Sequence, residues 1–307
     1  MVALFFTAGE LRAAGTDEIH GNLYDCTILP SGEVLMVGDQ GKIYRSAEAR
    51  SRWETIASGT KSPLFSVSFA DADHGWIAGK AGTILTTHDG GTTWTSQTSG
   101  TEKHLFAIAF SDSKHGCALG DWGIAVVTWD GGRTWADHSL TDDIILYAVF
   151  FESPTRGYAC GEFGGVYVTD DGGKTWTKIE TGVDETLFTL TAQGKNMVAG
   201  GMDGIIIVSG DGGRTWARAE NSSPRSIYEI TILGERGLAV GDFGTVLTTG
   251  DKGAHWRTLE GVPLEMSLFW MGSIEIAPNG NGMITGANGL VLPVRGWGLN
   301  LADGGAK

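Results

Sequence analysis

The sequence repeats itself seven times with a period of about 41 residues. Each repeat opens with an apolar doublet, and successive doublets begin 41, 41, 41, 41, 40 and 41 residues apart. The doublets are Leu23-Tyr24, Leu64-Phe65, Leu105-Phe106, Leu146-Tyr147, Leu187-Phe188, Ile227-Tyr228 and Leu268-Phe269. Periods of about 40 to 50 residues built from short strands are typical of β-propellers. Seven such repeats account for residues 23–301, so we expect one domain over this range.

One repeat contains four short strands. In the second repeat, residues 64–69 alternate apolar side chains with polar or small ones, which is the period-2 pattern of a strand. Two further strands are expected over residues 76–78 and 83–87, each bounded by a turn, and a fourth begins at Trp94. The sequence therefore predicts an all-β fold, a seven-bladed β-propeller with four antiparallel strands per blade.

Two short segments flank the predicted propeller. Residues 1–22 contain an apolar run, Val2–Phe6, which fits either a strand that closes the ring or the remnant of an export signal without its positively charged start. Residues 302–307 form a C-terminal tail. No stretch of 18 apolar residues exists, so we expect no direct membrane span.

The turn between the second and third strands reads G-x-x-G in all seven repeats. The glycine pairs are Gly38/Gly41, Gly79/Gly82, Gly120/Gly123, Gly161/Gly164, Gly201/Gly204, Gly241/Gly244 and Gly286/Gly289. Two residues between glycines suit a tight hairpin that requires positive φ. Because the first and third turns of an antiparallel blade lie at one end and the second turn at the other, these turns should ring the top face, near the central channel.

The variable residues of these turns form our candidate partner-binding surface. Several are aromatic or acidic, which suits docking of a protein. The candidates are Asp39, Asp121, Trp122, Glu162, Phe163, Asp203, Asp242 and Phe243. The simpler interpretation, which we favour from sequence alone, is that Trp122, Phe163 and Phe243 tuck between neighbouring blades.

The third turn carries the most specific motif, [S/T]-x-D-x-G-x-T-W, the Asp-box of BNR-type propellers. The Asp and Trp pairs are Asp89/Trp94, Asp130/Trp135, Asp171/Trp176, Asp211/Trp216 and Asp251/Trp256. The first repeat has a degenerate version ending at Trp53, and the seventh lacks the motif. We expect each aspartate to accept hydrogen bonds from its own turn and each tryptophan to bury its ring. Calcium binding is disfavoured, since a calcium loop needs several spaced carboxylates and a final Glu.

Composition excludes several classes of function. The chain holds 22 Lys and Arg against 36 Asp and Glu, a net charge of −14, which argues against nucleic-acid binding. The three cysteines, Cys26, Cys117 and Cys160, are odd in number and contain no C-x-x-C, so we expect buried, free thiols. The histidines have no metal-site spacing. We therefore expect no catalytic group, metal or cofactor, and a monomer.

The full repeat resembles the Ycf48/HCF136 family of photosystem II stability and assembly factors. The pattern L-[FY]-x-[VI]-x-F-x-D-x-x-H-G-W-x-x-G-x-x-G-x-I-x-x-T-x-D-G-G-x-T-W is matched best by residues 64–94, 105–135 and 146–176, and the resemblance extends over 23–297. It implies a protein without enzymatic activity that binds newly made membrane-complex subunits, notably the D1 precursor in a photosynthetic host. It also implies a periplasmic or thylakoid-lumenal location.

Two other functions remain open from the sequence. Sialidases and xyloglucanases also carry Asp-boxes, and a retaining glycoside hydrolase needs two carboxylates about 5–5.5 Å apart. A sialidase also needs three arginines around its substrate, whereas Arg133 and Arg214 lie in Asp-box turns and no R-I-P motif occurs. A glycan-binding propeller could use Trp122, Phe163 and Phe243 as stacking platforms.

Overall fold

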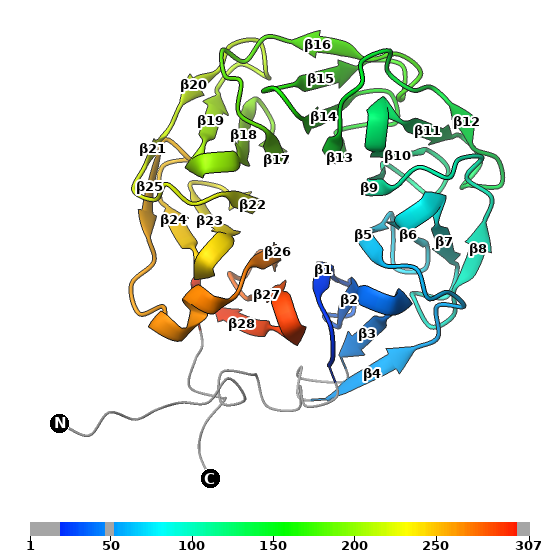
Figure 1. Ribbon diagram of the computed structural model, residues 1–307, viewed down its shortest axis with the longest axis horizontal. Coiled ribbons are helices and arrows are strands. Elements are labelled where there is room, and N and C mark those ends of the chain that lie inside the picture. Colours follow the sequence, from blue (N-terminus) through cyan, green and yellow to red (C-terminus); the bar gives the residue numbers. More distant parts are fainter. Residues whose placement is uncertain (1–18, 47–51, 300–307) are drawn as a thin grey trace.

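Seven antiparallel sheets stand side by side in a ring in the computed structural model, which describes residues 19–46 and 52–299 (Figure 1). Each sheet holds four consecutive strands that form one blade, and one sheet gains a fifth strand at its outer edge, which confirms the seven-bladed propeller. The first strands, which line the centre, are β1 (Leu23–Ile28), β5 (Leu64–Phe69), β9 (Leu105–Phe110), β13 (Leu146–Phe151), β17 (Leu187–Gln193), β22 (Ile227–Leu233) and β26 (Met271–Ile276).

The remaining strands follow outward in each blade. The second strands are β2 (Val34–Gly38), β6 (Gly75–Gly79), β10 (Gly116–Gly120), β14 (Gly157–Gly161), β18 (Asn196–Gly201), β23 (Arg236–Gly241) and β27 (Gly282–Gly286). The third are β3 (Ile43–Ser46), β7 (Ile84–Thr87), β11 (Ala125–Thr128), β15 (Val166–Thr169), β19 (Ile206–Ser209), β24 (Val246–Thr249) and β28 (Val291–Arg295). The fourth are β4 (Trp53–Ile56), β8 (Thr95–Gln97), β12 (Ala136–Asp137), β16 (Thr177–Ile179), β20 (Ala217–Arg218), β25 (His255–Thr258) and β29 (Gly298–Leu299). A short strand between blades 5 and 6, β21 (Glu220–Asn221), pairs in parallel with β25.

Short 3₁₀ turns make up the rest of the regular structure. Six of the seven G-x-x-G turns are of this kind: η1 (Asp39–Gly41), η3 (Lys80–Gly82), η4 (Asp121–Gly123), η5 (Met202–Gly204), η6 (Asp242–Gly244) and η8 (Ala287–Gly289). Another, η7 (Leu264–Leu268), lies in the connection between blades 6 and 7. No helix within the two described ranges is long and apolar enough to cross a membrane.

The core is a series of apolar seams between neighbouring blades. The second strand of each blade is almost completely buried because both of its faces pack against other blades. In the first seam, Leu35 and Val37 of blade 1 pack against Leu64, Val67 and Ile77 of blade 2. Burial of such side chains is the main favourable term in folding, so these seams stabilise the ring.

The three cysteines lie in these seams. Cys26, Cys117 and Cys160 are buried and free, as the sequence predicts. Burial raises the pKa of each thiol far above its ordinary value. The thiols are therefore protonated and inert at neutral pH.

The first strand of every blade contains a β-bulge directly after its first residue. In blade 1, Leu23 pairs with Gly38, but the next pair is Asp25 with Val37, so Tyr24 is left out of the ladder. The same register shift recurs in all seven blades. A bulge re-aims the extra residue, so the second residue of each doublet is released from the normal alternation of the strand.

The predicted start of the seventh repeat is wrong. Leu268 lies in η7 and is exposed, while the strand that pairs with Gly286 begins at Met271. The connection from blade 6 contains the extra turn η7, which moves the start of the blade by three residues. The apolar character of Leu268-Phe269 imitated a repeat start without being one.

The last blade takes all four of its strands from residues 271–299. The predicted closing strand falls on residues 1–22, of which 1–18 lie outside the described residues, as do 302–307. Blades 7 and 1 meet through side chains: Ile19, Cys26 and Met36 pack with Met283 and Val291.

Candidate functional site

The G-x-x-G turns are held by backbone hydrogen bonds. In the first copy, the N–H of Gly38 donates to the carbonyl of Lys42 at 3.1 Å, and the N–H of Lys42 donates to the carbonyl of Asp39 at 3.1 Å. Gly38 has an extended backbone, but a Cβ there would collide with the carbonyl oxygen of Asn22. Gly41 has φ of 71°, so it needs the freedom of glycine in the left-handed region. Glycine is therefore required at Gly38 for lack of space and at Gly41 for its backbone conformation.

The residue before the second glycine is also left-handed in every copy, although none is glycine. Its φ lies between 51° and 56° in all seven turns. These residues are Gln40, Ala81, Trp122, Phe163, Asp203, Phe243 and Asn288. Non-glycine residues are uncommon in this region, and each costs on the order of 1 kcal/mol. The strained position directs its side chain away from the turn.

Three of these side chains are large aromatics in contact with solvent. The exposed fractions are 63% for Trp122, 64% for Phe163 and 53% for Phe243, so the interpretation that they tuck between blades is wrong. The physical reason is the left-handed backbone, which points the side chain outward from the turn. Lys103 lies 5.7 Å from the centre of the Trp122 ring and Arg225 lies 4.4 Å from that of Phe243.

The exposed apolar side chains are concentrated on this end of the ring. The large hydrophobic residues exposed within the described ranges are Trp122, Phe163, Met202, Phe243, Leu264 and Leu268. The first four occupy G-x-x-G turns of blades 3 to 6, and the last two lie in η7, which packs beside η6. We call these six residues the apolar arc.

Most of the acids in the candidate surface have a structural task. Three of them accept a hydrogen bond from a backbone N–H in the segment just before the first strand of their own blade. The pairs are Asn22 to Asp39 at 3.0 Å, His104 to Asp121 at 3.2 Å and Ile145 to Glu162 at 2.8 Å. Asp242 accepts from the N–H of Phe243 at 3.1 Å. Asp203 occupies the left-handed position instead and projects into solvent.

A collar of aromatic rings surrounds the mouth of the channel at the same end, and the sequence interpretation missed it. Tyr24, in the bulge of β1, donates its hydroxyl to Asp39 of η1 at 2.8 Å, which places the collar directly beneath the G-x-x-G turns. Neighbouring ring centres lie 5.1 to 5.8 Å apart along six consecutive contacts. The collar consists of Tyr24, Phe65, Phe106, Tyr147, Phe188, Tyr228 and Trp270.

Six collar residues are the second member of a repeat doublet. The seventh blade has a glycine at this position, and its collar ring comes from a neighbouring residue instead. Gly272 occupies the bulge of β26, and a Cβ there would lie 2.5 Å from the ring of Trp270. Trp270 therefore fills the space over Gly272 and stacks on Tyr24. The aromatic second residue of each doublet was the signal that could have revealed the collar.

Three carboxylates line the channel within a cavity of about 710 Å³. Asp25 accepts hydrogen bonds from the N–H of Val67 at 2.8 Å and from the hydroxyl of Ser273 at 2.9 Å. Glu229 accepts from the hydroxyl of Thr189 at 2.9 Å. The carboxylate of Glu275 makes no hydrogen bond or ion pair with any residue described by the structure, and its half-buried side chain lines the cavity.

Burial in the channel raises the pKa of all three acids. The pKa of Asp25 rises to about 6, that of Glu275 to about 7 and that of Glu229 to about 8. Repulsion from Asp25 adds to the upward shift of Glu229 and Glu275. The surrounding protein disfavours the charged forms, and one acid opposes ionisation of the next.

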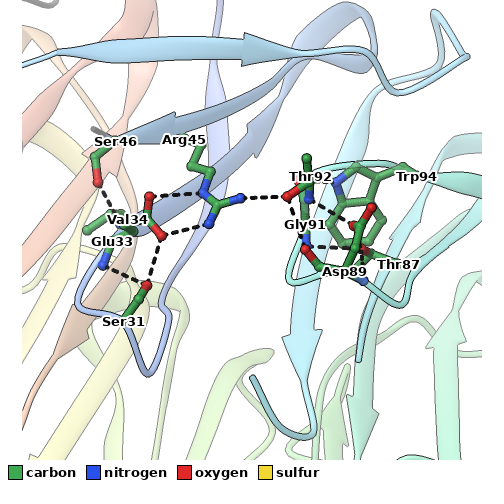
Figure 2. A network of polar contacts seen from close by, with 10 residues as sticks. All are labelled: Ser31, Glu33, Val34, Arg45, Ser46, Thr87, Asp89, Gly91, Thr92 and Trp94. Carbon is green, nitrogen blue, oxygen red and sulfur yellow. Dashed lines mark hydrogen bonds and ion pairs between the residues drawn. The ribbon is translucent and has the colours of Figure 1, made fainter. Parts of the chain in front are cut away.

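The Asp-boxes lie at the opposite end of the ring, and their aspartates accept hydrogen bonds from residues of the same turn. Asp89 accepts a hydrogen bond from the N–H of Thr92, and the hydroxyl of Thr87 donates to it at 2.7 Å (Figure 2). The N–H and the hydroxyl of Thr93 also donate to Asp89. This is the bonding that the motif predicts. The same arrangement holds for Asp130, Asp171, Asp211 and Asp251. Trp94 and Trp256 are buried, whereas Trp135, Trp176 and Trp216 are half-buried.

Polar contacts tie this end of one blade to the next. Arg45 of blade 1 donates to both carboxylate oxygens of Glu33, at 3.2 and 2.6 Å, and to the hydroxyl of Thr92 in the second blade at 3.1 Å (Figure 2). Other polar contacts at this end stay within one turn: His74 contacts Asp71, and His115 contacts Asp112. No group of three His, Cys, Asp or Glu side chains in the described part of the chain could hold a metal ion.

Comparison with known proteins identifies similar families and folds. The family model of photosynthesis system II assembly factor YCF48 matches residues 45–104, 94–180 and 139–275. YCF48 bound to D1 peptide has a TM-score of 0.74 and 17% identity, over 90% of this chain and 94% of that chain. YCF48 from Cyanidioschyzon merolae has a TM-score of 0.74 and 16% identity, over 90% and 96%.

A hydrolase is also similar in fold. The GH74 xyloglucanase from Xanthomonas campestris has a TM-score of 0.75 and 14% identity, over 95% of this chain and 53% of that chain. No curated protein sequence matches. At these identities the solved structures show the fold alone.

Proposed function

Because this chain belongs to the YCF48 family of photosystem II assembly factors, we propose that it is a non-catalytic scaffold that binds a polypeptide across the G-x-x-G end of its ring. The observation that carries this proposal is the apolar arc. Exposed large apolar side chains gathered on one face mark an interaction site more often than chance exposure. Aromatic side chains of this kind are also the common anchors of protein interfaces.

The backbone at these positions supports the same conclusion. Trp122, Phe163 and Phe243 hold left-handed conformations with more than half of each side chain exposed, so they contribute less to stability than the buried aromatic residues do. The turn adopts this conformation in all seven blades but does not need a large aromatic residue there, and this is a reason to infer a function at the three aromatic positions. A client polypeptide would cover these rings and supply the burial that the free protein lacks.

The client is a newly made subunit of a membrane complex in this proposal, similar to the D1 precursor if the host is photosynthetic. One of the solved structures similar in fold is YCF48 bound to D1 peptide, which supports a peptide as partner. The chain carries a net charge of −14, which disfavours nucleic acid. We place the protein, as a monomer, in the thylakoid lumen or periplasm.

Crosslinking capture from solubilised membranes of the source organism tests the proposal. The baits are the wild type, a Trp122→Ala/Phe163→Ala/Phe243→Ala variant and a Gln40→Ala/Asn288→Ala control, which changes the same turn position outside the apolar arc. We expect the wild type and the control to capture a membrane-complex subunit and the aromatic variant to lose it. Equal capture by all three would place the site elsewhere, and no such subunit with any bait would refute the scaffold.

Glycoside hydrolysis is the alternative that the GH74 similarity keeps in view. Asp121 and Glu162 are the acids of the G-x-x-G turns that we compare with a catalytic pair. Each already accepts a hydrogen bond from a backbone N–H. We therefore expect no turnover of a fluorogenic glycoside panel. Enzyme-like rates on any member of the panel would refute the non-catalytic function.

A further inference from the structure

We propose that the central channel is a socket for one cationic side chain, arginine or lysine, presented by the polypeptide that docks on the G-x-x-G end. This inference rests on the proposed function, because the socket opens on the same face as the apolar arc. It adds a specific chemistry to that function: the client must carry a basic residue within its docked segment.

The aromatic collar suits the entry of a cation. The faces and edges of seven rings surround the mouth, and the ring faces carry partial negative charge that attracts ammonium and guanidinium groups. The half-buried rings of Phe106 and Tyr147, for example, are 5.8 Å apart and line the cavity. A flexible aliphatic stem would lie against these rings while its charged end passes below them.

The charges below the collar favour the same occupant. Asp25, Glu229 and Glu275 line the cavity, and its described lining contains no Lys, Arg or His. Charges in a partly buried site are costly unless they are paired, and the described lining of the cavity offers these acids no counter-charge. A guanidinium or ammonium group would supply it.

Glu275 is the acid that most needs a ligand. Asp25 and Glu229 have partners on neighbouring blades, in Val67 and Thr189. Glu275 has none among the described residues, and its half-buried side chain lines the cavity. A half-buried carboxylate that has no protein donor and faces a cavity can accept a hydrogen bond from a donor that arrives from outside.

The channel mouth is continuous with the proposed docking face. The imidazole of His104, in the loop before blade 3, contacts the collar rings of Phe65 and Phe106 and lies 3.6 Å from Asp121. Asp121 is followed directly by Trp122 of the apolar arc. A peptide on the arc can therefore place a side chain over the collar without leaving the surface.

The test measures binding of two synthetic peptide amides that differ only in charge. One has a central arginine between leucines, and its twin has citrulline, which keeps the shape but is neutral. Titration calorimetry is run on the whole protein as wild type, Glu275→Gln, Glu229→Gln/Glu275→Gln and a Glu235→Gln control, an exposed acid outside the channel. Thermal unfolding of each variant confirms that it folds.

We expect the wild type and the Glu235→Gln control to bind the arginine peptide about tenfold more tightly than its twin. Glu275→Gln should reduce this preference about threefold, and the double variant should abolish it. Equal affinity for the two peptides, or a preference that survives in the double variant, would overturn the socket. Agmatine that binds the wild type as tightly as the arginine peptide would show a small amine as the occupant, which also overturns it.

The Trp122→Ala/Phe163→Ala/Phe243→Ala variant separates this inference from the proposed function. If client capture survives in that variant while the charge preference disappears in the double acid variant, the socket stands and the apolar arc does not. The reverse pattern keeps the arc and rejects the socket. Loss of client capture in the aromatic variant, together with loss of the charge preference in the double acid variant, supports both the apolar arc and the socket.

Discussion

The two ends of the ring are built from repeated turns that use their side chains in opposite ways. At the Asp-box end, carboxylates such as Asp89 and Asp211 accept hydrogen bonds from their own turns, and tryptophans such as Trp256 pack beneath them. At the G-x-x-G end, backbone hydrogen bonds hold the turn, an acid at its first variable position binds a loop N–H in several copies, and the side chain at the left-handed position is exposed.

This difference separates stability from function. A turn that depends on its side chains must keep them, and five Asp-boxes have nearly identical residues. A turn that depends on its backbone and two glycines can carry different residues at the left-handed position. The side chain there varies in size from that of Ala81 to that of Trp122. We infer that the fold is specified mainly at one end and binding mainly at the other.

The largest expected effect compares two tryptophans. Trp256 is 2% exposed and its indole N–H donates to the carbonyl of Gly253 at 2.9 Å, so Trp256→Ala should reduce the free energy of unfolding by about 3–5 kcal/mol. Trp122→Ala removes an exposed ring and should change it by less than about 0.5 kcal/mol. Urea unfolding of both variants provides the measurement. Similar losses for the two would contradict the separation, and the half-buried Trp135 should fall between them.

A smaller effect is expected from the aspartates of the two ends. Asp89→Ala leaves the N–H groups of Thr92 and Thr93 without their acceptor, so it should cost about 1 kcal/mol, a value reduced because the turn is exposed to water. Asp203→Ala at the other end removes an acid whose carboxylate is exposed, and should have little effect on unfolding. Equal effects in urea unfolding would show that the Asp-box carboxylate is not structural.

The channel and the Asp-boxes should respond to pH in opposite directions. The raised pKa values of Asp25, Glu275 and Glu229, about 6, 7 and 8, mean that the folded state holds more protons than the unfolded chain. The stability that these three acids contribute is therefore complete below about pH 4 and is lost as pH rises to about 8. Hydrogen bonds from Thr93 lower the pKa of Asp89 to about 2, so its contribution is present above about pH 4 and is lost as pH falls through 2.

Urea unfolding between pH 2 and 9 measures both slopes. We expect Glu229→Gln to flatten the decline between pH 5 and 8 without changing the acid side. Asp89→Asn should weaken the loss below pH 4 and leave the alkaline side unchanged. A wild-type curve that rises steadily from pH 5 to 8 would refute the raised pKa values in the channel.

The fold could be predicted because the same pattern of strands and turns recurs in the sequence at a regular period of about 41 residues. The doublets, the G-x-x-G glycines and the Asp-boxes each recur in register, so errors in one copy do not change the architecture. The exception is blade 7, where η7 shifted the start to Met271 and Leu268 imitated a doublet. A local insertion is invisible when its apolar residues fall at the expected spacing.

The candidate site was less predictable, for two physical reasons. The collar depends on β-bulges, which re-aim residues such as Tyr24 and have no signature in the period-2 pattern. The channel acids Asp25, Glu229 and Glu275 are far apart in sequence and meet only when the ring closes. The exposure of Trp122 depends on a left-handed backbone that is common for glycine and uncommon for tryptophan.

The smallest expected effect isolates backbone strain at the G-x-x-G end. Phe163 has φ of 55° and its ring is largely exposed, so substitutions there change strain with little loss of packing. Phe163→Gly relieves the strain but increases the freedom of the unfolded chain, so the free energy of unfolding should rise by no more than about 0.5 kcal/mol. Phe163→Val places a β-branched residue in the same region and should lose about 1 kcal/mol. If the two variants unfold at the same urea concentration, the left-handed position is not strained, and the proposed binding function then rests on the exposure of the aromatic side chains alone.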